Sequence, residues 1–158
     1  MMQNARVDEL HIDGAPPATQ IAVSLALGAG AGATHRIDAL AFTWDRAQVR
    51  ASGQVASDAP FALETQVSAS SLADASPPWS ARAQARGNLA ALDLGAQLDS
   101  TAAAGAALNA QASLQPFAAW PLGDLQASAR ALDLSALHGD APRTALDLDA
   151  SARTEGRD

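Results

Sequence analysis

The sequence predicts an all-β protein, with many strands of one kind in a long sheet. The main observation is alternation: in 79–89, small or apolar residues occupy the odd positions and polar residues the even ones. A period of two is typical of a strand with one dry face and one wet face. The same pattern returns in 21–27, 61–69 and 125–131. Turn-forming residues recur about every ten residues, which favours many short strands.

Ten strands are expected along the chain. Turn formers separate them, among them Gly14, Asp58, Pro77 and Gly139, because these residue types suit the dihedral angles of tight turns. The expected strands are 5–12, 20–28, 35–44, 47–56, 60–70, 79–89, 90–99, 105–115, 124–136 and 144–152.

A short motif, apolar-x-x-Leu-x-apolar, shifts the apolar phase by one residue wherever it occurs. A strand that carries it must bulge, bend or end there if its dry face is to stay on one side. The irregular spacing of the copies, about 30 to 50 residues, resembles a degenerate repeat. The four copies are Val7, Leu10 and Ile12; Ile37, Leu40 and Phe42; Leu89, Leu92 and Leu94; and Ala129, Leu132 and Leu134.

Helix is the rival interpretation, because Ala is the best helix former and makes up about a quarter of the chain. The segments 101–107 and 71–75 could form a turn or two of helix. Over most of the chain, Gly, Pro, Ser, Asp and Thr fall where helices would break, and apolar residues repeat at two rather than at three and four. The β interpretation is therefore preferred.

Composition excludes several classes of function. All ten basic residues are Arg, and the formal net charge is −7. No basic stripe could neutralise phosphates, so we expect no nucleic-acid binding. Adhesion to anionic membrane surfaces is disfavoured for the same reason. The absence of Cys removes disulfides and thiolate metal sites.

The candidate cofactor and metal residues are each better explained by structure. Gly28, Gly30 and Gly32 suggest a phosphate loop, but the chain has no Lys for a Walker loop and no Gly at Ala33 for the Rossmann spacing. A flexible connection between strands is expected instead. His11, His35 and His138 lie far apart in the sequence, so neither a metal nor a cofactor is expected.

The acidic residues do not predict an enzyme. Asp147 and Asp149 lie two apart on one strand face, while Asp93 and Asp133 each stand between two Leu residues. Paired carboxylates can serve acid–base or calcium chemistry, but alternation places these on a solvated face. No Gly-x-Ser-x-Gly elbow surrounds any Ser. We therefore expect a protein without catalytic residues.

The apolar face is the feature left to carry a function. Facing sheet layers normally lie about 10 Å apart and are filled by large side chains. Small residues at many inward positions would leave a slot that could accept an acyl chain, or they would simply permit close packing of a thin β-domain. Both interpretations stay open on the residues alone. The inward alanines are at 81, 83, 85, 110, 112, 127 and 129.

Several segments resemble the repeat region of the TamB family, the inner-membrane component of the translocation and assembly module. They are 116–123 (Pro-Phe-Ala-Ala-Trp-Pro-Leu-Gly) followed by Leu125, 131–137 (Ala-Leu-Asp-Leu-Ser-Ala-Leu) and 142–144 (Pro-Arg-Thr). The run Ala-Arg-Gly-Asn-Leu-Ala-Ala-Leu-Asp-Leu in 79–94 and the run Ala-Pro-Phe-Ala-Leu that ends 50–63 are similar to the same repeats. The resemblance covers essentially the whole chain, 1–158, as one stretch of repeats. Related AsmA-like bridge proteins share the architecture.

The resemblance implies an elongated β-taco, an open, β-solenoid-like stack of antiparallel strands that is folded into a U and has a hydrophobic groove. It implies a periplasmic segment of a longer, inner-membrane-anchored protein of a Gram-negative bacterium. Phospholipid acyl chains and, through the parent protein, the outer-membrane barrel TamA would be its partners, and its roles would be lipid transport and support of outer-membrane protein and autotransporter assembly. The residues expected to line the lipid groove are Leu25, Leu63, Val67, Ala83, Leu108, Leu114 and Ala127.

A second hypothesis belongs to another class of protein. A β-solenoid adhesin or an autotransporter passenger would also show many strands, but with a packed interior. Such solenoids usually have regular coil lengths and stacked Asn or aromatic ladders, which the sequence does not display. A packed solenoid would carry no copurifying phospholipid.

Overall fold

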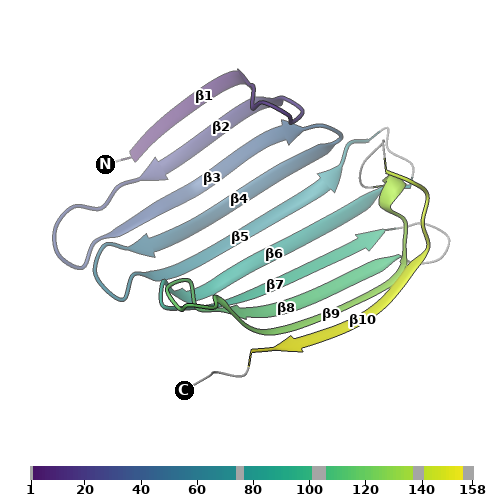
Figure 1. Cartoon of the computed structure of the whole chain (residues 1–158). Helices are drawn as coiled ribbons and strands as arrows, with labels where there is room; N and C mark the ends of the chain where they lie inside the picture. The colour runs from purple at the N-terminus through teal and green to yellow at the C-terminus, as the bar shows by residue number, and fades with distance from the viewer. Residues whose placement is uncertain (1, 74–76, 101–105, 137–140, 155–158) are drawn as a thin grey trace.

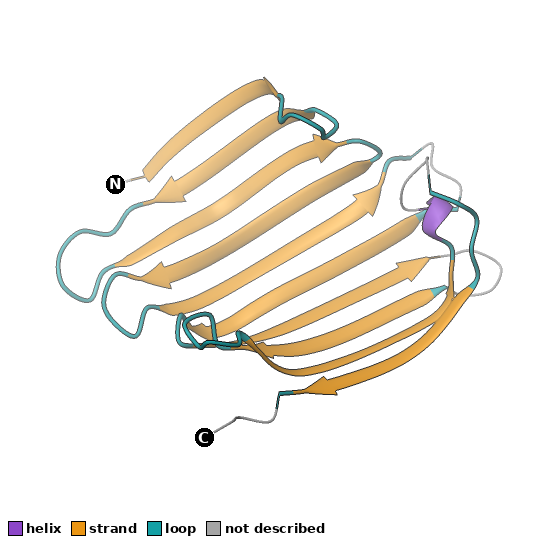
Figure 2. Ribbon diagram, in the orientation of Figure 1, coloured by secondary structure: helices purple, strands orange, loops and turns teal. Residues whose placement is uncertain are grey.

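The computed structural model describes residues 2–73, 77–100, 106–136 and 141–154. In these residues the chain forms one ten-stranded antiparallel sheet in which every strand pairs with its sequence neighbours, in the order β1 to β10. Figure 1 shows the resulting meander, with β1 and β10 at its two edges. Figure 2 shows that strands dominate and that helix is confined to one short turn before β10. The all-β expectation is confirmed.

The observed strands follow the expected ones closely, with ends that differ by a few residues. Alternation predicted them well because each strand keeps one apolar and one polar face. The elements are β1 (Met2–Leu10), β2 (Ala18–Ala26), β3 (Thr34–Trp44), β4 (Ala47–Ala56), β5 (Ala62–Ser71), β6 (Trp79–Asn88), β7 (Ala91–Ser100), β8 (Ala107–Leu114), β9 (Leu122–Leu132), the 3-10 helix η1 (Leu134–Ala136) and β10 (Leu146–Arg153).

The register keeps apolar residues opposite apolar residues from one strand to the next. In the centre of the sheet Val67 lies opposite Ala83, and Ala83 lies opposite Ala96. Their neighbours Gln66 and Gln84 lie opposite each other as well. Because directly paired residues point to the same side of a sheet, the apolar residues form one face and the polar residues the other.

Each copy of the phase-shifting motif lies at a bulge or at the end of a strand, as predicted. The register between β3 and β4 shifts between Ile37 and Leu40. In β9, Ala131 has a positive φ of 46°, and the pairing with β10 is irregular between Leu146 and Leu148. The copy that begins at Leu89 spans the turn between β6 and β7, and the first copy ends with β1. These irregularities return the apolar side chains to one face.

The expected strand 124–136 is too long, which corrects that prediction. β9 ends at Leu132, and the chain turns into η1. Asp133 causes the turn: its Oδ1 accepts hydrogen bonds from the Ser135 backbone N at 3.0 Å, the Ser135 hydroxyl at 2.8 Å and the Thr144 backbone N at 3.1 Å. Asp133 is half-buried. Its expected place on a solvated strand face is therefore also wrong.

Thr144 completes the network that closes the connection between β9 and β10. Its hydroxyl accepts a hydrogen bond from the Leu134 backbone N at 2.9 Å and donates one to the Leu132 carbonyl at 2.9 Å. These bonds hold η1 in place beside the end of β9. The two segments that could have been helical, 71–75 and 101–107, lie partly outside the described residues, at 74–75 and 101–105. Of the described residues at their ends, Ser71 belongs to β5 and Ala107 begins β8.

Acid is expected to loosen the Asp133 turn. The hydrogen bond from the Ser135 hydroxyl, with help from the Thr144 and Ser135 backbone N–H groups and from Arg143, lowers the pKa of Asp133 in the folded chain. A lowered folded pKa contributes stability that is present above the unfolded value, about 3.9, and is lost as the pH falls through the folded value. The protection factors of the Ser135 and Thr144 amides should therefore fall as the pH drops below about 4.

An Asp133→Asn variant tests this expectation. It should show fast exchange at Ser135 and Thr144 already at neutral pH, without the acid-dependent step in their protection. Asp93→Asn is the matched control, because Asp93 also stands between two Leu residues but is exposed. Protection factors that do not change with pH in the unaltered chain would contradict the role given to Asp133.

The sheet has little buried interior. Within the described residues only five apolar residues are buried. The two with the largest side chains, Leu98 and Leu132, are each 8% exposed. Three of them, Leu98, Ala129 and Leu132, form one cluster, against which Trp79 and Leu134 pack. No second sheet lies against the first in the described part of the chain. The two facing layers considered from the sequence are thus replaced by a single curved layer (Figure 1).

Candidate functional site

All seven residues expected to line a groove lie on the apolar face. Val67 lies opposite Ala83, and Ala127 belongs to the same row because it lies opposite Ala110, which lies opposite Ala96. Leu63 and Leu114 share a second row through Gly87 and Leu92. The other two, Leu25 and Leu108, lie on this face because Leu25 is opposite Ile37 and Leu108 is opposite Leu98.

One row crosses the whole sheet and takes one apolar residue from every strand. We call it the central row. Its length is about 43 Å, from nine spacings of about 4.8 Å between ten strands. Seven of its ten members are Ala, so most side chains along the row extend only one methyl group above the backbone of the sheet. From β1 to β10 the central row is Ala5, Val23, Leu40, Ala51, Val67, Ala83, Ala96, Ala110, Ala127 and Ala150.

Larger side chains border the central row in the second half of the sheet. In β7, Leu94 and Leu98 stand on either side of Ala96, two residues away in each direction. In β9, Leu125 stands beside Ala127. Because residues at i and i+2 point to the same face, these leucines rise next to a floor of methyl groups. The arrangement is a shallow apolar channel that runs across the strands.

Charged residues of β4 to β7 are confined to the opposite face. Arg82 and Arg86 alternate with Ala83 and Ala85 along β6, and the register keeps that phase in the neighbouring strands. On that face Arg86 Nε lies 3.0 Å from Glu64 Oε1. The members of this group are Arg50, Glu64, Arg82, Arg86, Asp93 and Asp99.

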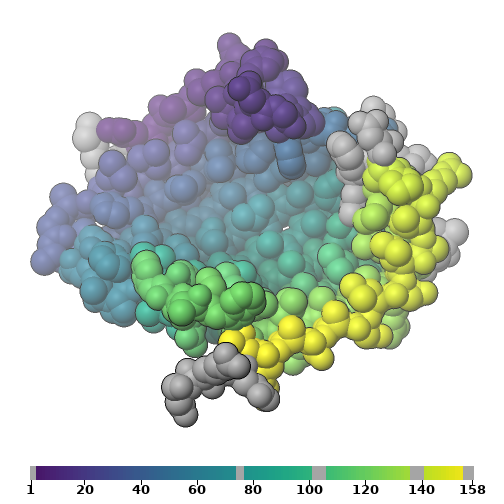
Figure 3. Space-filling view, viewed as in Figure 1, coloured from purple at the N-terminus to yellow at the C-terminus, as the bar shows by residue number. Residues whose placement is uncertain are grey.

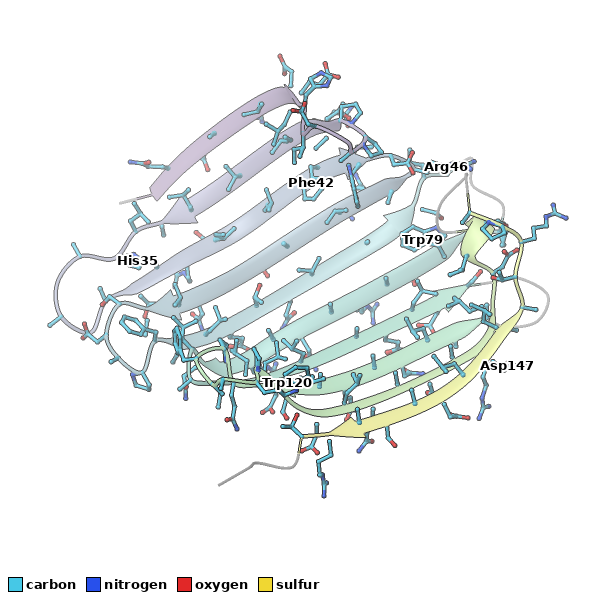
Figure 4. The ribbon with its side chains drawn as sticks, viewed as in Figure 1. His35, Phe42, Arg46, Trp79, Trp120 and Asp147 are labelled. Carbon is cyan, nitrogen blue, oxygen red and sulfur yellow. The ribbon has the colours of Figure 1, made fainter. Side chains whose placement is uncertain are left out.

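The apolar face is hollowed and largely uncovered. Figure 3 shows the hollow between the turn after β1 and the forward edge at β10, and Figure 4 places Phe42 and Trp79 on this viewed face. In the central row Val67 is 36% exposed, and Ala83 and Ala96 are also exposed. A contiguous exposed apolar face is a candidate interaction surface.

One end of the apolar face is covered by the chain itself. Leu132 and η1 fold against β6, β7 and β9, so that Ala129 is 4% exposed and Leu98 is 8% exposed. Trp79 and Ala81 pack against the same cluster. The channel is therefore closed on this side and open over the middle of the sheet. The sequence gives little sign of this cover, because Leu132 and Leu134 continue the pattern of a strand.

The opposite end carries exposed aromatic side chains. Phe117 is 79% exposed and Trp120 is 65% exposed, both in the turn between β8 and β9. Phe61, which precedes β5 at the same end of the sheet, is 40% exposed. Hydrogen bonds from the Gln115 N to the Pro121 carbonyl and from the Ala118 N to the Gln115 carbonyl shape the turn. Figure 4 shows Trp120 beside the hollow face. The two prolines around this segment are the sequence signal for its turn.

His35 also lies on the apolar face. It lies opposite Val55, which lies opposite Leu63. Its Nδ1 is buried and has no hydrogen-bond partner among the described residues. The other histidine that the structure describes, His11, is exposed, with Nε2 3.1 Å from Glu9 Oε1. His138 lies outside the described residues.

The polar face carries a feature that sequence reasoning missed. Between the long side chains of β4 to β8 lies a depression of about 740 Å³, lined among others by Arg50, Gln66, Arg82, Gln84 and Asn109. It exists because Arg and Gln side chains stand up from the sheet with gaps between them. The register also brings Gln66 opposite Gln84, and Gln111 opposite Gln126. Alternation predicted this face only as solvated.

The other candidate residues take structural places. Gly30 and Gly32, with φ of 94° and 72°, lie in the connection between β2 and β3, as expected. Asp149 is exposed, and Asp147 accepts a hydrogen bond from the Ala131 N at 2.9 Å. The described residues contain no group of three or more His, Asp or Glu side chains arranged to hold a metal ion. In the same residues no helix has the length and hydropathy needed to cross a membrane.

The described residues define a class by their fold and surface: an open antiparallel sheet with one largely uncovered apolar face and only five buried apolar residues. Comparison with protein-family models, with curated proteins and with solved structures finds no match to this chain.

Proposed function

We propose that the apolar face binds the acyl chains of phospholipids and that the protein is a non-enzymatic conduit segment. The observation that carries the proposal is the uncovered central row, which is apolar in every strand and exposed at Val67 and Ala83. An acyl chain laid across the strands would cover this row. Each methylene transferred from water contributes about 0.8 kcal/mol when fully buried, and no polar partner is needed.

The geometry favours chains over compact ligands. The central row is long and narrow, and its low floor of Ala side chains is bordered by Leu94, Leu98 and Leu125. Headgroups would stay in water at the open side, since charged residues of β4 to β7 point to the other face. We therefore expect weak discrimination among phospholipids that differ only in headgroup.

The resemblance to the TamB family supports a proposal on the larger setting of this activity. We infer that the chain serves in the periplasm as part of an inner-membrane-anchored protein, moves phospholipid between the two membranes and supports outer-membrane protein and autotransporter assembly. TamA would be the partner of the parent protein. The support is the resemblance of the repeat segments together with an open, curved sheet that is compatible with a β-taco.

Ala83→Arg tests the proposal directly. Ala83 is exposed in the middle of the central row, so the fold should tolerate the change, with a stability effect within about 0.5 kcal/mol. A bound acyl chain would have to desolvate the guanidinium, at a cost of several kcal/mol. We expect at least about a tenfold loss of affinity for a phosphatidylethanolamine with a fluorophore on one acyl chain, and loss of copurified phospholipid in native mass spectrometry.

Gln84→Arg is the matched control. It adds the same charge one residue away, on the polar face, and should leave phospholipid binding unchanged. Equal binding by both variants and the unaltered chain would place the lipid elsewhere and would refute the proposal. Absence of lipid binding by the unaltered chain would refute it as well.

The second candidate, a β-solenoid adhesin or passenger segment, has one observation in its favour. The pairs of Gln66 with Gln84 and of Gln111 with Gln126 form part of an amide ladder on the polar face. A packed interior is nevertheless part of that hypothesis, and the described residues bury only five apolar side chains in an open sheet. The acyl-chain surface is therefore preferred.

A further inference from the structure

The polar face carries two arginines that share one row across three strands. Arg50 in β4 lies opposite Ser68 in β5, and Ser68 lies opposite Arg82 in β6. We call these three residues the Arg–Ser–Arg triplet. Directly paired residues point to the same side of a sheet, so both guanidinium groups and the Ser68 hydroxyl stand on one face. The two arginines are separated by two strand spacings, about 9.6 Å, and their long side chains can converge over the short Ser68.

Neither arginine of the triplet is paired with a carboxylate within the described residues. Arg50 donates a hydrogen bond from Nη2 to the neutral amide oxygen of Gln48 at 2.9 Å, and the side chains of Arg82 and Ser68 make no hydrogen bond or ion pair in the same residues. The positions beside the triplet in β4, β5 and β6 are all uncharged on this face. They are Gln48, Ser70 and Ser80 on one side, and Ser52, Gln66 and Gln84 on the other. The triplet is therefore an uncompensated positive centre in a chain of net charge −7.

The triplet forms one wall of the depression of about 740 Å³ on the polar face. The other wall holds the amide side chains of Gln66, Gln84 and Gln111, and Asn109 continues the wall of the triplet into β8. An amide side chain both donates and accepts hydrogen bonds, so these residues suit hydroxyl groups. The volume lies within the range of small-molecule sites, about 300–1,000 Å³. The depression thus joins a positive end to an amide-lined remainder.

Carboxylates around the depression limit the length of an anion that could bind there. Asp38 lines its β3 end, where Arg36 Nε lies 3.2 Å from Asp38 Oδ1. In the other direction, the row of the triplet ends at Asp149 in β10, and Asp99 stands on the same face of β7. A long polyanion would extend from the triplet towards these carboxylates and be repelled, whereas a compact anion would meet the two arginines alone. The charge distribution therefore favours a small anion.

We propose that the Arg–Ser–Arg triplet binds the phosphate or carboxylate group of a small, hydroxyl-rich anion, such as a phosphorylated or carboxylated sugar. Guanidinium groups form short, charge-assisted hydrogen bonds with such oxyanions, often two for each Arg. The Ser68 hydroxyl donates a further bond between the two arginines, and Gln66 and Gln84 bind the hydroxyl groups of the ligand. The site lies on the face opposite the central row, so it is separate from the acyl-chain surface.

Isothermal titration calorimetry tests the site with three probes: glucose phosphorylated at its primary hydroxyl, glucuronate and uncharged glucose. The unaltered chain should bind the glucose phosphate or the glucuronate, and the tighter of the two identifies the anionic group. Glucose should bind at least about tenfold more weakly than that anion, because it lacks the charge-assisted bonds. Arg82→Gln should weaken binding of the anion at least about tenfold for the same reason. Arg82 is exposed, so the fold should tolerate this change.

Arg86→Gln is the matched control. It makes the same change on the same face of β6, but Arg86 is paired with Glu64 and does not line this depression, so the affinity should stay the same. The proposal is overturned if neither anion binds, if glucose binds as tightly as the anions, or if Arg82→Gln and Arg86→Gln have equal effects. Phospholipid binding by Arg82→Gln is expected to persist, so failure of this site is distinguishable from failure of the acyl-chain surface.

Discussion

Ala129→Arg is expected to cost several kcal/mol of stability, whereas Ala83→Arg on the same face costs almost nothing. Ala129 is 4% exposed and belongs to the cluster with Leu98 and Leu132. An arginine there must either bury an unpaired charge or displace the cover formed by Leu132 and η1. Leaving a buried charge without a partner costs about 3–5 kcal/mol. That is a large part of the 5–15 kcal/mol that stabilises a typical domain.

Urea unfolding followed by circular dichroism measures this difference. The midpoint of Ala129→Arg should fall well below that of Ala83→Arg, and the latter should overlay the unaltered chain. The comparison is matched, because both substitutions replace an Ala of the apolar face with the same residue. Equal midpoints would mean that the cover over Ala129 contributes no stability and that the sheet stands on its strand pairing alone.

The contrast between these two alanines also marks what sequence could predict. Both were assigned to the apolar face from their alternation with polar neighbours, and both lie there. The assignment succeeded because hairpin turns such as Leu89–Ala90 preserve the register, so that the phase of one strand sets the phase of the next. Strand periodicity carries no information on what lies above a face. Exposure at Ala83 and burial at Ala129 therefore needed the structure.

The cover itself depends on contacts that periodicity does not encode. The sequence pattern predicts Asp133 as a strand residue between Leu132 and Leu134. Its Oδ1 instead accepts a hydrogen bond from the backbone N of Thr144, eleven residues later. A side chain that accepts backbone N–H groups offers the chain an alternative to the ladder, and here that alternative ends β9. The same limit explains the polar depression, because Arg50 and Arg82 come together only through the pairing of β4, β5 and β6.

Alternation also left the site open between two interpretations, a slot for an acyl chain or a thin domain with close packing. Small inward residues are compatible with both, since Ala at a position does not say whether another layer covers it. The single curved sheet favours the first interpretation, because Val67 and Ala83 are exposed rather than packed against a second layer. The Ala83→Arg variant tests the proposal that acyl chains bind there.

Gly87→Val is expected to destabilise the sheet by about 1–3 kcal/mol, because it strains the hairpin that joins β6 and β7. Gly87 has a φ of 134°, a region that is essentially confined to glycine. A Cβ there would lie 2.2 Å from the Ala91 carbonyl oxygen, which is backbone and cannot move aside alone. Next to it, Asn88 Oδ1 accepts hydrogen bonds from the Ala90 and Ala91 N–H groups and fixes the turn.

Gly95→Ala is the control for Gly87→Val. Gly95 lies within β7, and a Cβ there would meet only the flexible Gln84 side chain, at 3.3 Å or more. Its replacement should be neutral or stabilise by up to about 1 kcal/mol, since Ala restricts the unfolded chain more than Gly does. Thermal unfolding of the three chains separates the cases. Similar melting temperatures for Gly87→Val and the unaltered chain would show that the β6–β7 hairpin can shift its register, and the alignment of the apolar rows between these strands would then not depend on this turn.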